Sequence, residues 1–130
     1  MHIKRLGDCK EITAGDGTRL RELLHPERDA TAIRYSLAEA WVEPAQRSKP
    51  HRLATTEVYY IMSGRGVMHI DEEAAAVEAG DAVYIPPGSR QWLENAGGEP
   101  LHFLCVVDPA WRAEDEEVLP DIPLNITGPG

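Results

Sequence analysis

The sequence predicts an all-β domain, and three observations lead to this prediction. The chain has 130 residues, and because typical domains run to roughly 100–150 residues, one domain is expected. Eleven glycines and ten prolines punctuate it densely, which suits many short strands better than a few long helices. Short runs rich in β-branched and aromatic residues recur about every ten residues, as in a sandwich or barrel.

The first strands are predicted from alternation and turn residues. Thr18–Leu24 fits either a short helix or an edge strand, and the strand is favoured because His25 and Pro26 interrupt a helix. In segment 35–43 the larger apolar residues recur at positions 35, 37 and 41, which predicts a strand. Segments 57–62 and 66–71 flank Gly64, which predicts a hairpin with a glycine turn.

The later segments complete the expected order. Short strands are expected at 75–78, 82–85 and 90–94, and the long apolar run 101–108 predicts a strand buried on both faces. One or two helical turns are expected within 111–119, after Pro109. The segment from Pro120 to Gly130 is expected to be a tail.

The net charge of the chain argues against two classes of partner. Thirteen basic and 22 acidic residues give a net charge of −9, which would repel both a nucleic-acid backbone and an anionic membrane. Cys9 and Cys105 form neither a disulfide framework nor metal-ligand spacing. No signal peptide or membrane span is recognised, so a cytoplasmic protein without nucleic-acid or membrane partners is expected.

Two spaced motifs in the middle of the chain resemble those of the cupin family. The spacing of Gly80, Pro86, Gly88, Gln91 and Asn95 is that of the second cupin motif, G-x5-P-x-G-x2-H-x3-N, with Gln91 in place of the histidine. The first motif is matched upstream, with Leu53 where its second histidine would stand; its matching residues are His51, Glu57 and Gly64. The chain therefore resembles a small single-domain cupin of the cupin 2 type.

The resemblance implies a double-stranded β-helix, the jelly-roll cupin barrel, with a site in its open mouth. It places the barrel at 35–108, an N-terminal extension that packs on the barrel or on a partner at 1–34, and a short helix and tail at 109–130. It also implies a homodimer in which N-terminal strands exchange. Many cupins bind a divalent metal such as Mn, Fe, Ni or Zn, and no organic cofactor is expected.

The strand period predicts which side chains meet in the mouth. Because alternate residues of a strand share a face, an extended segment 51–61 turns one set of side chains inward. Gln91 and Leu93 would share the corresponding face of a later strand. The inward set of the first segment is His51, Leu53, Glu57, Tyr59 and Ile61.

Both departures from the motifs weaken a metal site. Leu53 offers no donor atom, and the amide oxygen of Gln91 is a weaker ligand than an imidazole. The candidate metal ligands are therefore His51, Glu57 and Gln91, and the alternative is that Gln91 only forms hydrogen bonds. A buried Glu57 needs a cation or hydrogen-bond donor beside it; the arginines considered for this are Arg34, Arg52 and Arg90.

The function predicted from these residues is the binding of a small polar metabolite in the barrel mouth. If the chain is an enzyme, lyase or isomerase chemistry by proton transfer on a sugar-like or keto acid substrate is favoured, with His51 or Glu57 as base and Tyr59 as donor. Trp41 and Tyr35 are further aromatic candidates for the mouth. The alternatives are a non-catalytic binding module that retains the pocket and a metal-dependent dioxygenase.

Overall fold

Nearly the whole chain is built from short strands. In a computed structural model, the structure describes residues 1–121. The elements are, in chain order, η1 (Leu6–Asp8), β1 (Glu11–Thr13), β2 (Arg19–Leu24), β3 (Ser36–Val42), β4 (His51–Leu53), β5 (Thr56–Ser63), β6 (Arg65–Ile70), β7 (Glu73–Glu78), β8 (Ala82–Ile85), β9 (Gln91–Asn95), β10 (Leu101–Asp108), η2 (Ala113–Asp115) and β11 (Glu116–Val118).

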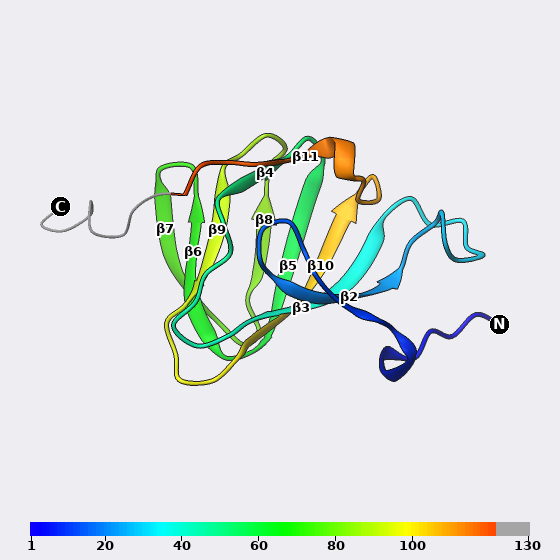
Figure 1. The fold of residues 1–130 in the computed structure, drawn as a ribbon, viewed down its shortest axis with the longest axis horizontal. Helices are drawn as coiled ribbons and strands as arrows, with labels where there is room; N and C mark the ends of the chain where they lie inside the picture. Colours follow the sequence, from blue (N-terminus) through cyan, green and yellow to red (C-terminus); the bar gives the residue numbers. More distant parts are fainter. Residues whose placement is uncertain (122–130) are drawn as a thin grey trace, which may run out of the picture.

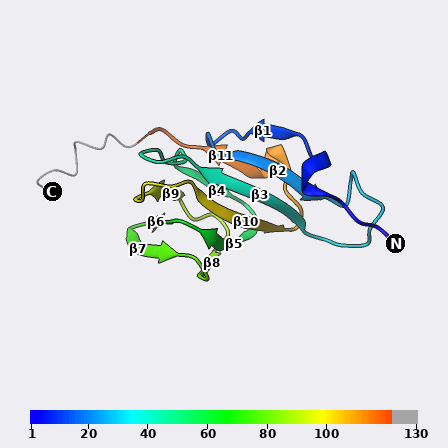
Figure 2. The ribbon, with the colours of Figure 1, turned by 90° about the horizontal axis from the view of Figure 1, so that it is seen from below.

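The strands form two antiparallel sheets that enclose one core. The larger sheet has the order β1-β2-β3-β10-β5-β8 and the smaller one β11-β4-β9-β6-β7. In Figure 1 the smaller sheet's β6, β7 and β9 lie on one side and the larger sheet's β2 and β3 on the other. Seen from below, β1 and β2 lie at the margin opposite β7 and β8 (Figure 2). The predicted all-β jelly roll is confirmed.

The turn at Gly64 joins the two sheets, so the predicted hairpin is wrong. β5 pairs with β10 and β8, whereas β6 pairs with β7 and β9. Gly64 has φ +85°, and a Cβ there would lie 2.6 Å from the carbonyl oxygen of Pro100. A Cβ on Gly66 would collide with the carbonyl oxygen of Glu94. The two glycines thus allow the chain to cross from one sheet to the other, at a point where the backbones approach closely.

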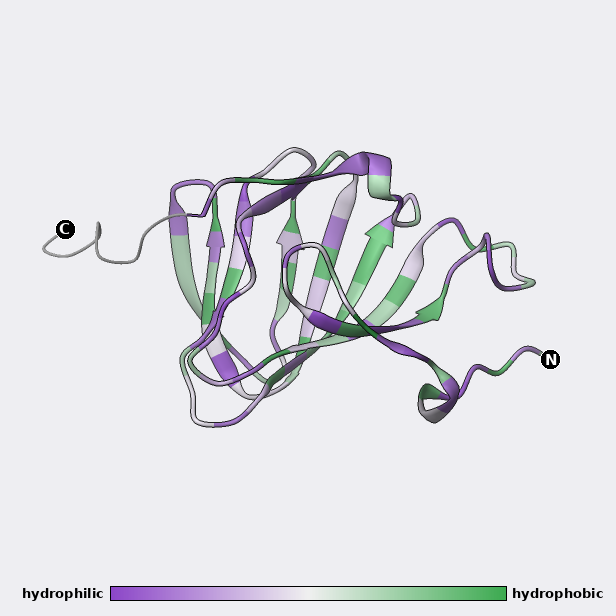
Figure 3. Cartoon of the chain, viewed as in Figure 1, coloured by the Kyte–Doolittle hydropathy of each residue, from purple (hydrophilic) through white to green (hydrophobic). Residues whose placement is uncertain are grey.

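Alternation along the strands sets the inner and outer faces, seen as alternating bands in Figure 3. In β3 the small residues Ala38 and Ala40 line the interior cavity, so Leu37 and Trp41 face outward. In β10, Leu101, Phe103 and Val107 are buried, while the residues between them are only half-buried. Strand β10 is therefore buried mainly on one face, not on both as predicted.

The segments before β3 and after β10 both add strands to the sheets. Segment 19–24 is a strand, as favoured over a helix, and pairs with β3. After β10 the chain forms one 3-10 turn, η2, and then β11, which pairs with β4. The predicted C-terminal helical turn is confirmed, but 116–118 is a strand. Of the expected tail, residues 122–130 lie outside the described residues.

Within residues 1–121 no helix is long and apolar enough to cross a membrane. The two cysteines of the chain are free thiols.

Candidate functional site

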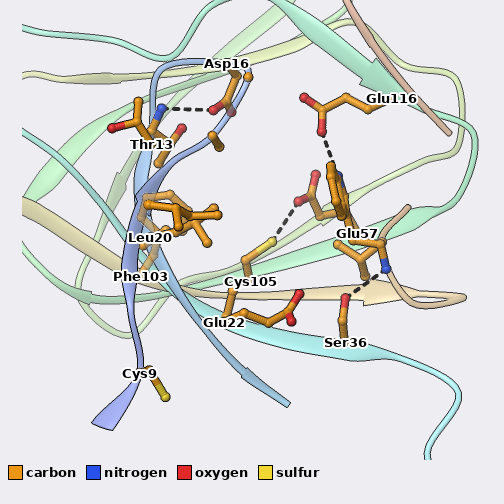
Figure 4. A pocket seen from close by; sticks show the side chains of 18 of the residues that line it. Cys9, Thr13, Asp16, Leu20, Glu22, Ser36, Glu57, Phe103, Cys105 and Glu116 are labelled. Atoms are coloured by element: carbon orange, nitrogen blue, oxygen red, sulfur yellow. Dashed lines mark hydrogen bonds between the residues drawn. The ribbon is translucent and has the colours of Figure 1, made fainter. Parts of the chain in front are cut away.

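A cavity of about 670 Å³ opens between the two sheets. Its lining comes from the N-terminal strands, from β3, β4, β5 and β10, and from the segment after β10. Figure 4 shows Leu20 and Thr13 on one side of this cavity and Glu57 and Glu116 on the other. Its volume falls within the range of about 300–1,000 Å³ that is usual for small-molecule sites.

His51 lies at the start of β4, beside Gln91 of β9. Its Nδ1 is 2.8 Å from the carbonyl oxygen of Lys49, and because a carbonyl only accepts, Nδ1 carries the hydrogen. Its Nε2 is 3.4 Å from Oδ2 of Asp16. The side chains of His51 and Asp16 are both buried, so the imidazole is held in one orientation with a carboxylate beside its second nitrogen.

Glu57 is a buried carboxyl that accepts hydrogen bonds from two uncharged donors. Gln91 Nε2 donates to its Oε1 at 2.8 Å, and the Cys105 thiol donates to its Oε2 at 2.7 Å. Burial raises the pKa of Glu57, and the hydrogen bonds from Cys105 and Gln91 and the nearby His51 oppose this rise. The carboxyl therefore holds its proton to a higher pH than an exposed glutamate.

Tyr59 orients the amide of Gln91. The Tyr59 hydroxyl donates to Gln91 Oε1 at 3.2 Å, which directs the amide nitrogen toward Glu57. Burial, and then the charge of Glu57, raise the pKa of Tyr59 well above its usual 10.0, so the phenol stays neutral. Its ring packs on Phe103 with the ring centroids 4.5 Å apart. The hydrogen bonds thus run from Tyr59 through Gln91 to Glu57.

The hydrogen bonds of Gln91 do not fit an ion held by His51, Glu57 and Gln91. The amide oxygen accepts from Tyr59, and the amide nitrogen, which cannot ligate a cation, points at Glu57. Leu53, buried beside this cluster, offers no donor atom. Among residues 1–121 no cluster of three or more His, Cys, Asp or Glu side chains is arranged to hold a metal ion. Metal binding at these three residues stays a prediction.

Most of the predicted inward set reaches the cavity region, but the predicted charge partners do not. The residues of this set that line the cavity are His51, Leu53, Glu57 and Tyr59. Gln91 is hydrogen-bonded to two of them, Glu57 and Tyr59. The arginines proposed to face Glu57 lie elsewhere. Arg34 and Arg52 are exposed, and Arg90 donates to the backbone oxygen of Asp71 and lies over the ring of Trp92; the prediction of an arginine partner is therefore wrong.

The two further aromatic candidates also lie outside the cavity. Trp41 faces outward, with the Arg19 guanidinium 4.8 Å from its ring centroid. Tyr35 is exposed at the edge of β3. In each case an adjacent small residue, Ser36 or Ala40, takes the inner face of the strand.

Four residues of the site are missing from the predictions made from sequence. Cys105 shares the inner face of β10 with Phe103, and period-two counting along that strand would have found it. Asp16 lies in the turn between β1 and β2, and Trp111 and Glu116 follow β10, where no motif position marks them. These three come to the cavity only through long-range pairing.

Comparisons with known proteins agree with this architecture. The family profile described as "Cupin domain" matches residues 39–107. An uncharacterized protein of Methanocaldococcus jannaschii is 43% identical over 111 residues, which cover 85% of this chain and 88% of that protein.

Solved structures extend the comparison to the fold. Pac13 of Streptomyces, described as a nucleoside dehydratase, has a TM-score of 0.74 and 19% identity over 95% of this chain and 94% of that one. Oxalate decarboxylase of Bacillus subtilis has a TM-score of 0.75 and 24% identity over 88% of this chain and 31% of that one. At these identities the likeness shows the fold alone.

Proposed function

Because the chain belongs to the cupin family, we propose that it binds a small, uncharged, hydroxylated metabolite in the barrel mouth and catalyses proton transfer on it, as a lyase or isomerase. The observation that carries this proposal is the pair formed by Glu57 and His51. One is a buried carboxyl with a raised pKa, the other an imidazole with a fixed tautomer, and both line the same cavity. Because the two side chains lie in different environments, one can act as the acid and the other as the base.

The charges of the lining favour an uncharged ligand. Even with Glu57 protonated, five acids line the cavity against the three cations Lys4, Lys10 and Arg28; the five acids are Asp8, Asp16, Glu22, Asp29 and Glu116. The exposed cations Lys4 and Arg28 are engaged by Asp29 and Glu22; Lys4 Nζ lies 2.7 Å from Asp29, and Arg28 Nε lies 2.6 Å from Glu22. A second carboxylate entering this region would meet like charge. Of the two substrate classes expected from sequence, this supports a sugar-like compound over a keto acid.

Each side chain has a distinct role in the proposed reaction. His51 takes a proton on Nε2, and Asp16, 3.4 Å away, stabilises the resulting imidazolium. Glu57 donates a proton to a leaving or rearranging oxygen, because its raised pKa keeps it protonated at higher pH. Tyr59 acts as a positioning residue, since its hydroxyl is engaged by Gln91.

A non-catalytic binding module is the second candidate. Leu53 and Gln91 replace two motif histidines, and the side chain of Gln91 is hydrogen-bonded to Tyr59 and Glu57. Both features would be expected of a protein that binds a ligand in the cavity but catalyses no reaction. The Streptomyces Pac13 structures include a complex with uridine, which supports testing nucleosides together with free sugars.

The test is deuterium incorporation from D₂O into carbon positions of the bound compound, followed by mass spectrometry. The panel contains neutral aldoses, ketoses, nucleosides and keto acids. We expect incorporation into a neutral hydroxylated compound, and its loss in His51→Gln and Glu57→Gln but not in the exposed control Glu73→Gln. Binding of such a compound without any incorporation would instead support the binding module.

The metal is tested separately in the same assay. The protein is treated with EDTA, analysed for residual metal, and assayed with and without added Mn²⁺, Fe²⁺, Ni²⁺ or Zn²⁺. Incorporation that persists without metal would support proton transfer by His51 and Glu57 alone. Stoichiometric metal that is lost together with activity in His51→Ala would contradict that assignment.

A further inference from the structure

We propose that Trp111 forms one wall of a slot in the cavity that stacks a flat, unsaturated ring, so that the ligand carries such a ring beside its hydroxyl groups. This inference rests on the proposed function only in placing the ligand in the same cavity. It concerns specificity, and it names a residue that neither motif contains.

Trp111 is held firmly although its side chain is not buried. Its backbone N–H donates to Ser36 Oγ at 3.0 Å, and its indole N–H donates to Glu116 Oε1 at 2.7 Å. Its carbonyl oxygen lies 2.8 Å from Nε2 of His25, which is 1% exposed. Two of these contacts, those with Ser36 and His25, come from distant parts of the chain. They fix the residue before any ligand arrives, so little conformational freedom is lost on binding.

The indole nevertheless leaves apolar surface exposed at the cavity. Trp111 is 37% exposed and lines the cavity. Its one polar side-chain atom is already satisfied by Glu116, so a ligand would meet the apolar ring and not an unpaired donor. A rigid aromatic face of this kind gains most from a flat π-system laid against it.

The surroundings of Trp111 continue this apolar wall and set the polarity next to it. Glu116 pairs across the sheet with Leu53, the residue that replaces a motif histidine. Leu53 and Trp111 thus line the same cavity through neighbouring strands and segments. Across the cavity from Glu116, the hydrogen-bond partner of Trp111, lie Leu20 and Thr13 (Figure 4). A ring between these sides would leave its attached hydroxyls near Glu57 and the other carboxylates.

The size of the cavity allows both parts of such a ligand. About 670 Å³ is available, and sites of about 300–1,000 Å³ accommodate drug-sized ligands. The carboxylates next to the slot disfavour a phosphate or carboxylate substituent. The expected ligand class is therefore a neutral, ring-bearing polyhydroxyl compound, of which a nucleoside is the simplest probe.

Uridine and methyl β-D-ribofuranoside are suitable probes, since they share the sugar and differ in the flat ring. Binding is measured by calorimetry on the full chain. We expect the wild type to bind uridine about tenfold or more tightly than the riboside, as base–aromatic stacking predicts. In Trp111→Leu this preference should disappear with little change in riboside binding. Trp111→Phe should keep most of it, and Trp41→Leu, which removes an outward-facing indole, should leave it unchanged.

Several results would overturn the slot. They are a wild type that binds neither probe or does not prefer uridine, and a Trp111→Leu variant that weakens both probes equally. Should the leucine variant fail to fold, quenching of indole fluorescence by uridine decides the question, because it should fall sharply in Trp111→Phe. Uridine preference retained in Glu57→Gln, together with no deuterium incorporation in wild type, would sink the proposed reaction and leave the slot standing.

Discussion

Two carboxylates in different regions of the chain experience opposite environments. Glu57, in the barrel interior, is surrounded by the uncharged donors Gln91 and Cys105, and burial raises its pKa. Asp29, in the N-terminal segment, lies 2.7 Å from Lys4 Nζ and accepts the backbone N–H of His25 at 2.9 Å. The Lys4 bond, then the His25 bond, lower its pKa from 3.8 to about 2. At Glu57 burial outweighs two uncharged donors, whereas at Asp29 the charged Lys4 and the His25 N–H outweigh burial.

The two carboxylates therefore make opposite contributions to stability as pH changes. A raised pKa in the folded state means that the contribution of Glu57 is complete below its usual pKa of 4.5 and is lost as pH rises through the folded value. A lowered pKa means that the contribution of Asp29 is present above 3.8 and is lost as pH falls toward about 2.

Glu57→Gln should have the largest effect on activity, and it would remove the carboxyl with the raised pKa. Deuterium incorporation should fall roughly 100-fold or more, as expected for loss of a general acid. The free energy of unfolding at pH 8 should stay equal or rise, because no buried charge remains and the new amide can still accept from Gln91. Denaturant unfolding at pH 5 and pH 8 measures this. A variant that is less stable at pH 8 than the wild type would contradict the raised pKa.

Tyr59→Phe tests the neutral network around Glu57. Removal of the hydroxyl leaves the buried Gln91 oxygen without its donor, which should destabilise the fold by about 1–3 kcal/mol. Proton transfer should slow because the amide no longer has one orientation. The exposed Tyr84, changed to Phe, is the matched control. Equal stability of the two variants would show that the Tyr59–Gln91 bond contributes nothing.

Asp29→Asn tests the other side of the contrast. Stability near neutral pH should fall by about 1 kcal/mol, the scale of an accessible ion pair. The acid-unfolding curve between pH 4 and pH 2 should become flatter, because the lowered pKa no longer contributes. Deuterium incorporation per folded molecule should be unchanged. A variant with the same acid-unfolding curve as the wild type would argue against the Lys4–Asp29 pair.

Cys105→Ala should give the smallest effect, a shift in pH dependence. Its thiol donates to Glu57 and lowers the pKa of that carboxyl, so its removal should move the high-pH limit of activity upward, by up to roughly one pH unit. Cys105→Ser retains a donor and should keep the wild-type limit. An identical shift in both variants would mean that packing, and not the hydrogen bond, is responsible.

Parts of the candidate site could be predicted because they depend on local spacing. The motif from Gly80 to Asn95 correctly placed strands β8 and β9 and the turn between them. Alternation along 51–61 correctly placed His51, Glu57 and Tyr59 on one buried face. The same counting was insufficient at Leu37 and Trp41, because alternation identifies two faces without saying which one meets the core.

The sequence by itself determined strands β2, β3 and β5 to β10, most of their turns, and the inward set around Glu57, because a period of two and a glycine turn are local properties. Only the tertiary structure decided that the Gly64 turn crosses between sheets and that Cys105, 48 residues from Glu57, donates to it. It also brought Asp16 to His51 and Trp111 to the cavity. The reason is physical: these contacts are made between strands far apart in the chain, and pairing across the sheets fixes them.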